Sequence, residues 1–241
     1  MTTEKNQLVK LLWDSQFFGY GVGKVELEAI SVVQILNIIK EAKEDCLKVI
    51  YLIAKDFDTL SIQRTEAVGA ILYDKKTTYF KKSQPAPLLS SCINSYSKNL
   101  SAEPLYSLAI QSGAYSRFFT DKNFQYAEFQ RLYTTWIENS VNRSIAREVL
   151  VYKEKEEDYK GLITLGIKDS RLDIGLLAVD TKYRGKNIGS KLLNAATDYA
   201  DRWECSGMQV VAQGTNVLAC KFYEKHGFQK ESVQYLLHLW I

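Results

Sequence analysis

Residues 183–193, YRGKNIGSKLL, carry residue types that suit one kind of chemistry. Two glycines, two cations and a serine stand between Arg184 and Ser190, just before an amphipathic helical pattern. Glycines let main-chain N–H groups approach a ligand closely, and the N–H groups at a helix start favour a phosphate. Arg184 and Lys186 add positive charge. The stretch therefore predicts a loop that binds a phosphate or pyrophosphate.

The spacing of this loop excludes two common phosphate-binding motifs. The ATP-type pattern GxxxxGK[ST] fails because the lysine follows the first glycine and Gly189 is followed by Ser190. The dinucleotide pattern GxGxxG fails because Gly185 stands alone and no ribose-binding acid follows at the right distance. A plain helix entry with two turn glycines is the alternative to a ligand loop.

The pattern that does fit is R-G-x-x-I-G followed by a helix. It resembles the acetyl-CoA pyrophosphate loop of the GCN5-related N-acetyltransferases (GNAT), commonly Q/R-x-x-G-x-G/A, with Asn187 where that family usually has glycine. Downstream, GTNVLACKFYEKHGF resembles the second signature of the family, N-x-x-A-x-x-F/L-Y-x-x-x-G-F. The residues that match it are Asn216, Ala219, Phe222, Tyr223, Gly227 and Phe228.

The resemblance implies acetyl-CoA as co-substrate and no metal. In the family, the strand before the loop is splayed from its neighbour so that pantetheine can pair with it, and Asn216 by analogy hydrogen-bonds the pantetheine arm. The plain alternative for Asn216 is a residue near a helix start. The residues predicted to contact the coenzyme are Leu177, Ala178, Val179, Arg184, Gly185, Lys186, Asn187, Ile188, Gly189, Ser190, Asn216, Ala219 and Phe222.

Acyl transfer from a thioester needs a deprotonated amine, donors for the oxyanion and a proton for the thiolate. Because the family lays the helix of Tyr223 beside the coenzyme sulfur, we predict Tyr223 as the general acid; the alternative is a tyrosine packed in an aromatic core. A main-chain N–H near Leu177–Val179 is the expected oxyanion donor, although the sequence does not fix which. We expect His226 to be a helix-end residue and His238 to be structural. No residue stands out as the general base.

The first half of the chain carries the only indication of the acceptor. WDSQFFG (13–19) and the stretch from Ala114 to Val141 resemble the TDP-fucosamine acetyltransferase group, whose members acetylate the 4-amino group of a TDP-linked dideoxy sugar for surface polysaccharide, such as lipopolysaccharide. We therefore predict a TDP-amino sugar as partner, with Arg117 and Glu138 as its first candidate ligands. The alternatives are another amine (a protein N-terminus, a polyamine or an antibiotic) and a non-catalytic acyl-CoA-binding module.

Composition bounds the class of protein. The 241 residues carry a net charge of +3 with lysine and arginine dispersed, so no nucleic-acid partner is expected. The four cysteines are far apart and there are only two histidines, so neither a metal site nor a disulfide framework is indicated. The start, MTTEKNQLVK, lacks the apolar core of a signal peptide, and no stretch is apolar enough for a membrane helix. We expect a cytoplasmic protein.

The order of elements predicts an α/β fold. We expect turn-like aromatic residues at 13–19 before a strand at Gly21–Leu27, then a helix capped by Ser31 with Leu36 on its apolar face. A Pro- and Ser-rich stretch holds Pro85, Pro87 and Pro104 and favours a domain boundary near residue 100. Antiparallel strands and then βαβαβ predict a mixed sheet flanked by helices over 101–241, a GNAT fold by resemblance, with 1–100 as a degenerate GNAT-like domain on the substrate side. The aromatic last strand is either a core strand or the interface of a homodimer.

Overall fold

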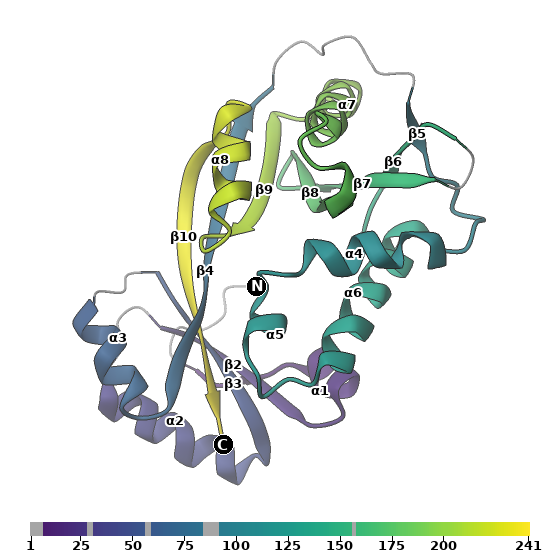
Figure 1. Ribbon diagram of the computed structural model, residues 1–241. Coiled ribbons are helices and arrows are strands. Elements are labelled where there is room, and N and C mark those ends of the chain that lie inside the picture. The colour runs from purple at the N-terminus through teal and green to yellow at the C-terminus, as the bar shows by residue number, and fades with distance from the viewer. Residues whose placement is uncertain (1–6, 28–30, 56–58, 84–91, 156–157) are drawn as a thin grey trace. The chain divides into compact units, whose positions relative to one another are not determined.

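The computed structural model describes residues 7–27, 31–55, 59–83, 92–155 and 158–241 (Figure 1). These residues form two compact units. Unit 1 comprises residues up to Thr77 with Gln213–Thr215 and Ser232–Ile241, and unit 2 comprises Thr78–Ala212 with Asn216–Glu231. The change of unit falls inside a strand, whereas the expected boundary lay near residue 100. Unit 1 also includes Ser232–Ile241, because Tyr235–Trp240 pairs with Val49–Ala54.

Unit 1 is built on strands from both ends of the chain. Its strand order is β1-β2-β3-β10-β4, with β2 and β3 parallel and β10 antiparallel to β3. The last strand lies between β3 and β4, as the core-strand alternative expects. The elements are β1 (Val9–Lys10), α1 (Leu12–Phe18), β2 (Gly21–Leu27), α2 (Val32–Glu44), β3 (Leu47–Ala54), α3 (Thr59–Glu66), β4 (Ala70–Lys82) and β10 (Gln229–Trp240).

Two details of unit 1 differ from expectation. The aromatic residues at 13–19 form helix α1, which ends at Gly19 in the left-handed conformation, rather than a turn. In α2, Ser31 accepts the N–H of Gln34 and caps the helix as predicted. Leu36, however, is 52% exposed, and Ile35 and Ile38 take the buried face. A helix turns 100° per residue, so Leu36 points well away from Ile35, and the buried stripe runs through Ile35, Ile38 and Ala42.

Unit 2 places helices on both faces of a mixed, largely antiparallel sheet, as predicted. Its strand order is β4-β9-β8-β7-β6-β5, and only β8 and β9 pair in parallel among the registers described. The elements are β5 (Ile93–Ser95), η1 (Glu103–Leu105), α4 (Tyr106–Ser112), α5 (Arg117–Thr120), α6 (Tyr126–Val141), β6 (Glu148–Lys153), β7 (Tyr159–Lys168), β8 (Arg171–Val179), η2 (Thr181–Tyr183), α7 (Ile188–Arg202), β9 (Gly207–Gln213) and α8 (Val217–Lys225).

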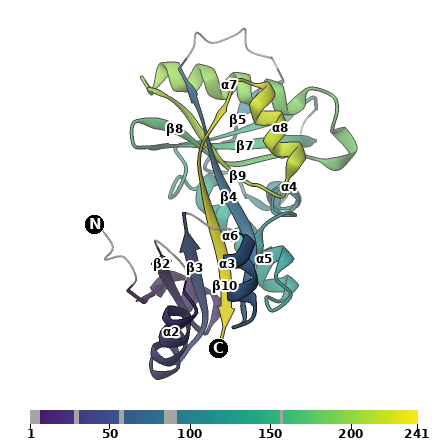
Figure 2. The ribbon, with the colours of Figure 1, turned by 90° about the vertical axis from the view of Figure 1, so that its left-hand side faces the viewer.

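Alternate residues of β6 show the two faces of this sheet. Leu150 and Tyr152 pack in a core with α7 and α8, whereas Val149 and Val151 pack in a second core with α4 and α6. Figure 2 shows α7 and α4 on opposite sides of strands β7 and β8. The turn between β7 and β8 has positive φ at both Asp169 and Ser170, which is the geometry of a two-residue hairpin.

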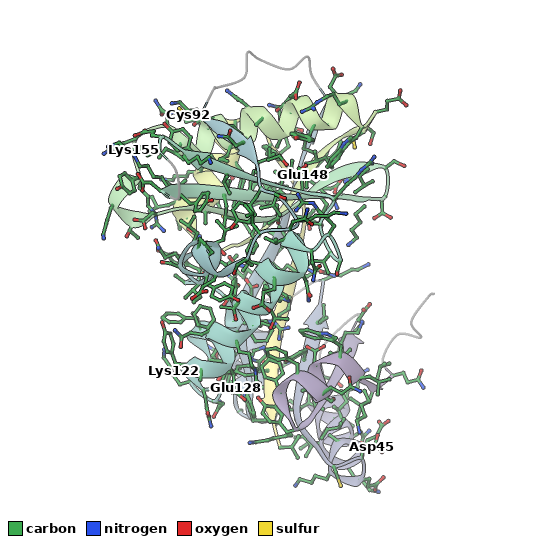
Figure 3. All side chains as sticks on the ribbon, turned by 90° about the vertical axis from the view of Figure 1, so that its right-hand side faces the viewer. Asp45, Cys92, Lys122, Glu128, Glu148 and Lys155 are labelled. Atoms are coloured by element: carbon green, nitrogen blue, oxygen red, sulfur yellow. The ribbon has the colours of Figure 1, made fainter. Side chains whose placement is uncertain are left out.

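The start of α6 shows how local sequence fixes an element of unit 2. Gln125 and Glu128 form a capping box, in which the Gln125 N–H donates to Oε2 of Glu128 at 2.7 Å. Figure 3 labels Glu128 together with Lys122, whose ammonium lies 4.9 Å from the centroid of the Phe119 ring. Of the expected linker, Pro85 and Pro87 lie outside the described residues, and Pro104 lies in η1.

Candidate active site

The predicted phosphate loop joins η2 to α7. Gly185 has φ +78° and Asn187 has φ +59°, so both adopt the left-handed conformation. Asparagine is among the few non-glycine residues that adopt it readily, which explains how Asn187 replaces a glycine here. The N–H groups of residues 186–190 have no acceptor within the described part of the chain. The loop therefore presents a row of donors at the positive end of a helix.

The second loop glycine has another purpose than expected. Gly189 lies inside the first turn of α7, which begins at Ile188 rather than at Ser190. A Cβ at position 189 would lie 3.2 Å from Cζ of Phe222 and 3.7 Å from Cγ2 of Val179. Gly189 therefore allows α7 to approach α8 and the end of β8 closely, and it does not supply a positive φ.

The strand before the loop separates from its parallel neighbour. Leu172, Asp173 and Ile174 of β8 pair with β9, and the described pairing ends there although both strands continue. At the same point, the register between β7 and β8 shifts. Thr164 faces this bulge and accepts the N–H of Leu176 at Oγ1, at 2.8 Å. The divergence matches the splayed strand that the family resemblance implied.

The pairing with β7 shows which main-chain groups face the gap beside β8. Asp180 donates its N–H to the carbonyl of Lys160 at 2.9 Å, in register with the pairs that follow. In antiparallel pairs, hydrogen-bonded and non-bonded positions alternate. Ala178 is therefore bonded to β7, whereas the N–H groups of Leu177 and Val179 point away from β7 and into the gap. These two groups are the candidates for the oxyanion donor.

Helix α8 brings the predicted acid to the same place. Its N-cap is Asn216, whose side chain accepts the N–H of Ala219 at 3.1 Å. Asn216 is therefore a residue at a helix start, as the alternative interpretation expected, and a contact with the pantetheine arm stays a prediction. Tyr223 is 6% exposed, and its ring lies within 5.7 Å, between centroids, of both Phe222 and Phe228. No hydrogen bond joins the Tyr223 hydroxyl to a described residue. Burial raises the pKa of Tyr223, so the phenol keeps its proton at neutral pH.

A cleft of about 370 Å³ lies within unit 2 and joins these parts. The predicted residues that line it are Leu177, Ala178, Val179, Arg184, Gly185, Asn187, Ile188, Gly189, Ser190, Asn216, Ala219, Phe222 and Tyr223. The cleft is also lined by residues that the sequence analysis did not predict there: Gln111, Ser112, Ala114, Tyr115, Tyr183, Leu218, Lys225 and His226.

Three predicted residues lie elsewhere. Lys186 does not line the cleft, and its ammonium lies 5.2 Å from the centroid of the Tyr183 ring. Arg117 places its guanidinium over the Phe118 ring at 4.2 Å. Glu138 accepts a short hydrogen bond from the hydroxyl of Tyr106 and so ties α6 to α4. Whether Arg117 and Glu138 contact an acceptor stays a prediction.

Two polar residues of the cleft link its walls. His226 places Nδ1 2.7 Å from the carbonyl oxygen of Phe222 and Nε2 2.9 Å from Oγ of Ser190, so it joins α8 to the start of α7. Gln111 of α4 accepts the N–H of Thr181 at 3.0 Å. Neither link could be found by sequence spacing, because each joins segments 36 or more residues apart.

The residues present fit acetyl-CoA. The donors at the start of α7 suit its pyrophosphate, and the outward N–H groups of β8 suit a pantetheine amide or a carbonyl oxygen. The charged side chains among the described lining residues are Arg184 and Lys225, both cations, which suits an anionic ligand. No group of residues that could hold a metal ion was found in the described ranges. Among the helices described, none combines the length and apolarity that crossing a bilayer would require.

The fold and cleft of unit 2 are those of an acetyltransferase-type α/β domain. Residues 110–228 match the model of the acetyltransferase (GNAT) family, so this part of the chain is a GNAT domain, as the two signatures predicted. The matched range begins at the end of α4 and ends after α8, and it contains every residue that lines the cleft.

Two curated relatives connect the chain to polysaccharide synthesis. It is 26% identical over 177 residues to a spore coat polysaccharide biosynthesis protein of Bacillus subtilis, covering 72% of this chain and 55% of the relative. It is 31% identical over 111 residues to the dTDP-fucosamine acetyltransferase of Escherichia coli O6:H1, covering 45% and 46%. The chain thus spans about half the length of these relatives.

Solved structures agree on the fold. A conserved protein of unknown function from Staphylococcus epidermidis has a TM-score of 0.71 at 15% identity, covering 99% of this chain and 92% of that one. A GCN5-related N-acetyltransferase from Sphaerobacter thermophilus has a TM-score of 0.61 at 12% identity, covering 96% and 75%. The likeness therefore extends over nearly the whole chain, unit 1 included.

Proposed function

We propose that the protein transfers an acetyl group from acetyl-CoA to a primary amine. The observation that supports this most is the convergence in one cleft of the donor row at the start of α7, the outward N–H groups of Leu177 and Val179, and the protonated phenol of Tyr223. A module that only bound the coenzyme would have no use for the phenol.

Bound acetyl-CoA would supply the thioester, and the chain's own residues would supply the rest. Two N–H groups of β8, held apart from β9, would stabilise negative charge on a carbonyl oxygen. Tyr223 holds a proton that it would give to the sulfur of the leaving thiolate. The bulge opposite Thr164 would fix the direction of the β8 donors, because Thr164 holds the N–H of Leu176 at 2.8 Å.

For the acceptor, we propose the 4-amino group of a TDP-linked amino-dideoxy sugar, used for surface polysaccharide. This rests on the name of the Escherichia coli relative, dTDP-fucosamine acetyltransferase, and on the polysaccharide role named for the Bacillus relative. The cationic lining of the cleft, from Arg184 and Lys225, is compatible with anionic ligands. Such a reaction belongs in the cytoplasm, where both substrates would be available.

A second acceptor class is favoured by one observation. The chain is 36% identical over 62 residues to streptothricin acetyltransferase A of Bacillus subtilis, although these residues cover only 26% of this chain and 36% of that protein. Streptothricin is an amine antibiotic. An antibiotic acceptor is therefore the alternative that the test must separate from a nucleotide sugar.

The test is a turnover screen of the purified chain with acetyl-CoA. The panel would hold TDP-4-amino-4,6-dideoxygalactose, its C4 epimer, streptothricin, spermidine and a peptide with a free N-terminus. We expect turnover with the TDP-amino sugars to exceed turnover with the other amines by at least about two orders of magnitude, since a site that pairs polar groups rejects ligands that lack them. Preferential turnover of streptothricin would refute the sugar assignment and leave the acetyltransferase proposal standing.

We further propose that unit 1 is a degenerate copy of the GNAT fold that serves the substrate side. A tandem GNAT protein from the clavulanic acid pathway has the same fold over 91% of this chain, with a TM-score of 0.56 at 12% identity. In unit 1, as in unit 2, two parallel strands stand beside a helix, β2 and β3 with α2. Acceptor contacts made by unit 1 would appear as loss of acceptor affinity, with unchanged coenzyme affinity, in variants of residues 13–19.

A further inference from the structure

The imidazole of His226 joins the coenzyme loop to the helix of the predicted acid. Nδ1 lies 2.7 Å from the main-chain oxygen of Phe222, and Nε2 lies 2.9 Å from Oγ of Ser190. The ring also packs on Phe222, with centroids 4.4 Å apart. Ser190 stands in the first turn of α7, three residues after the N-cap Asn187, beside the unused N–H donors.

The partners of His226 decide where its protons lie. A carbonyl oxygen only accepts, so Nδ1 must carry a hydrogen. In the neutral ring, Nε2 is then an acceptor, and the hydroxyl of Ser190 must donate to it. Ser190 consequently has no proton left for a phosphate oxygen, which is itself only an acceptor.

Protonation of the ring reverses this bond. Nε2–H then donates to Oγ of Ser190, and the hydroxyl proton of Ser190 becomes free to donate to a phosphate. The imidazolium also brings a positive charge to the start of α7, where an anion binds. Both the freed hydroxyl proton and the positive charge favour the state in which a phosphate is bound.

We infer that His226 is a positioning residue that takes up a proton when the pyrophosphate of the coenzyme binds, and that it thereby turns Ser190 into a phosphate donor. The inference rests on the proposed function, because it presumes that the loop binds coenzyme A. The proton comes from solvent, moves to Nε2 and returns to solvent when the coenzyme leaves. By linkage, the coenzyme binds more tightly as the pH falls through the range in which imidazoles titrate.

Several charged groups lie on the elements that surround the cleft. Arg184 and Lys225, both cations, line the same cleft as His226. Glu224, its neighbour on α8, accepts the hydroxyl of Tyr79 at 3.2 Å. Lys191 of α7 lies 3.4 Å from the hydroxyl of Tyr152. Lys186 of the loop lies over the Tyr183 ring. The bound anion would offset the repulsion between these cations and an imidazolium.

The first experiment measures affinity by calorimetry between pH 5.5 and 8.5. Acetyl-dephospho-CoA is the ligand, because the 3′-phosphate of coenzyme A itself titrates near pH 6 and would confuse the result. We expect the dissociation constant to fall about five- to tenfold from pH 8.5 to 5.5, the worth of one hydrogen bond with partial charge assistance. Buffers of different ionisation enthalpy would report the proton taken up on binding.

Two variants separate the imidazole from its surroundings. His226→Gln keeps a permanent N–H donor toward Ser190, so we expect affinity within about twofold of the wild-type value at pH 5.5 and no pH dependence. Ser190→Ala removes the group through which the proton acts, so we expect the pH dependence to shrink at least about threefold while the fold is kept. Wild-type pH dependence retained in His226→Gln would overturn the inference.

Nitrogen NMR supplies a readout that a merely structural histidine would not move. The chain has only two histidines, and His238 is fully buried in unit 1, with ring centroids 5.1 Å from Tyr51 and 5.0 Å from Tyr73, so it serves as internal control. We expect the ligand to move the His226 signals from those of the Nδ1–H tautomer toward those of the imidazolium, by an amount that linkage ties to the five- to tenfold change in affinity. No change on binding would refute the inference, whereas absence of coenzyme binding at every pH would refute the proposed function instead.

Discussion

Replacing Tyr223 by phenylalanine removes one oxygen atom from the cleft and little else. The ring keeps its neighbours, because Tyr79, Phe222 and Phe228 contact it through their own rings. The hydroxyl forms no hydrogen bond to a described residue, so its loss leaves no partner unsatisfied. We therefore expect the free energy of unfolding to change by less than about 1 kcal/mol and the dissociation constant for acetyl-CoA to change by less than about twofold.

Turnover should respond very differently. A lost general acid costs about two orders of magnitude in rate, which corresponds to about 2.7 kcal/mol in the activation barrier. The assay is release of the free thiol, followed with a thiol-reactive dye at saturating acetyl-CoA, beside calorimetric binding of acetyl-CoA. A Tyr223→Phe rate within about threefold of the wild type would show that the phenol is not the acid.

Tyr79→Phe is the matched control for this experiment. Tyr79 is 1% exposed and packs on the same helix, but it does not line the cleft, and its hydroxyl donates to Glu224. We expect a loss of about 1 kcal/mol in stability and a rate within a few fold of the wild type. An equal fall in rate for both variants would mean that these tyrosines only position α8.

The raised pKa of Tyr223 also determines the direction in which folding stability changes at high pH. Burial favours the neutral phenol in the folded state, so this group contributes stability that is present below the ordinary tyrosine pKa of about 10 and is lost as the pH rises toward the raised value. Tyr223→Phe should therefore lose less stability than the wild type between pH 9 and pH 11. A steeper loss in the variant, measured by urea unfolding, would contradict the direction of the shift.

Three further substitutions test the geometry of the site. Thr164→Val leaves the partly buried N–H of Leu176 without its acceptor, and we expect a loss of about 1–3 kcal/mol in urea unfolding together with a slower rate; Thr164→Ser should restore both. Asn216→Ala removes the cap on the N–H of Ala219 and should lower the free energy of unfolding by about 0.5–2 kcal/mol, whereas Asn216→Asp should keep most of that stability. A loss of coenzyme affinity in Asn216→Asp would then report a direct contact between Asn216 and the coenzyme. Gly185→Ala meets no atom within 4 Å, so its expected cost of about 1–2 kcal/mol would come from φ +78° alone, and an unchanged melting temperature would refute that reasoning.

The donor half of the site was largely predictable from the sequence. A hydrophobic strand, a glycine loop and an amphipathic helix follow one another directly. These patterns predict a strand at Leu172–Val179 and a helix from Ser190 to about Trp203, close to the observed Arg171–Val179 and Ile188–Arg202. The pattern after Asn216 likewise predicts a helix at Val217–His226, which differs from the observed α8 by a single residue. Short-range order of this kind is what periodicity and turn residues encode.

The remaining features depend on contacts that sequence spacing does not encode. The bulge in β8 exists because Thr164 on another strand holds the N–H of Leu176, and register between strands leaves no mark on either strand's own pattern. Gln111 and His226 reach the cleft through bonds to segments 70 and 36 residues away. Helix α1 was missed because its aromatic residues lack a clear helical period.

Asn187 shows why a mismatch in a motif can still be correct. Its residue type departs from the family pattern at a position that is usually glycine. Its backbone conformation does not, because the position requires φ near +60° and asparagine adopts that conformation at lower cost than other non-glycine residues. The loop therefore keeps the conformation that directs its N–H groups outward, and it gains a polar side chain beside the phosphate site.

Since the constraint is conformational, Asn187→Gly should preserve coenzyme affinity within about twofold, whereas Asn187→Val, β-branched at positive φ, should weaken it by about tenfold or more. Equal affinities for these two variants, measured by calorimetry with acetyl-CoA, would show that the left-handed residue is not what shapes the loop.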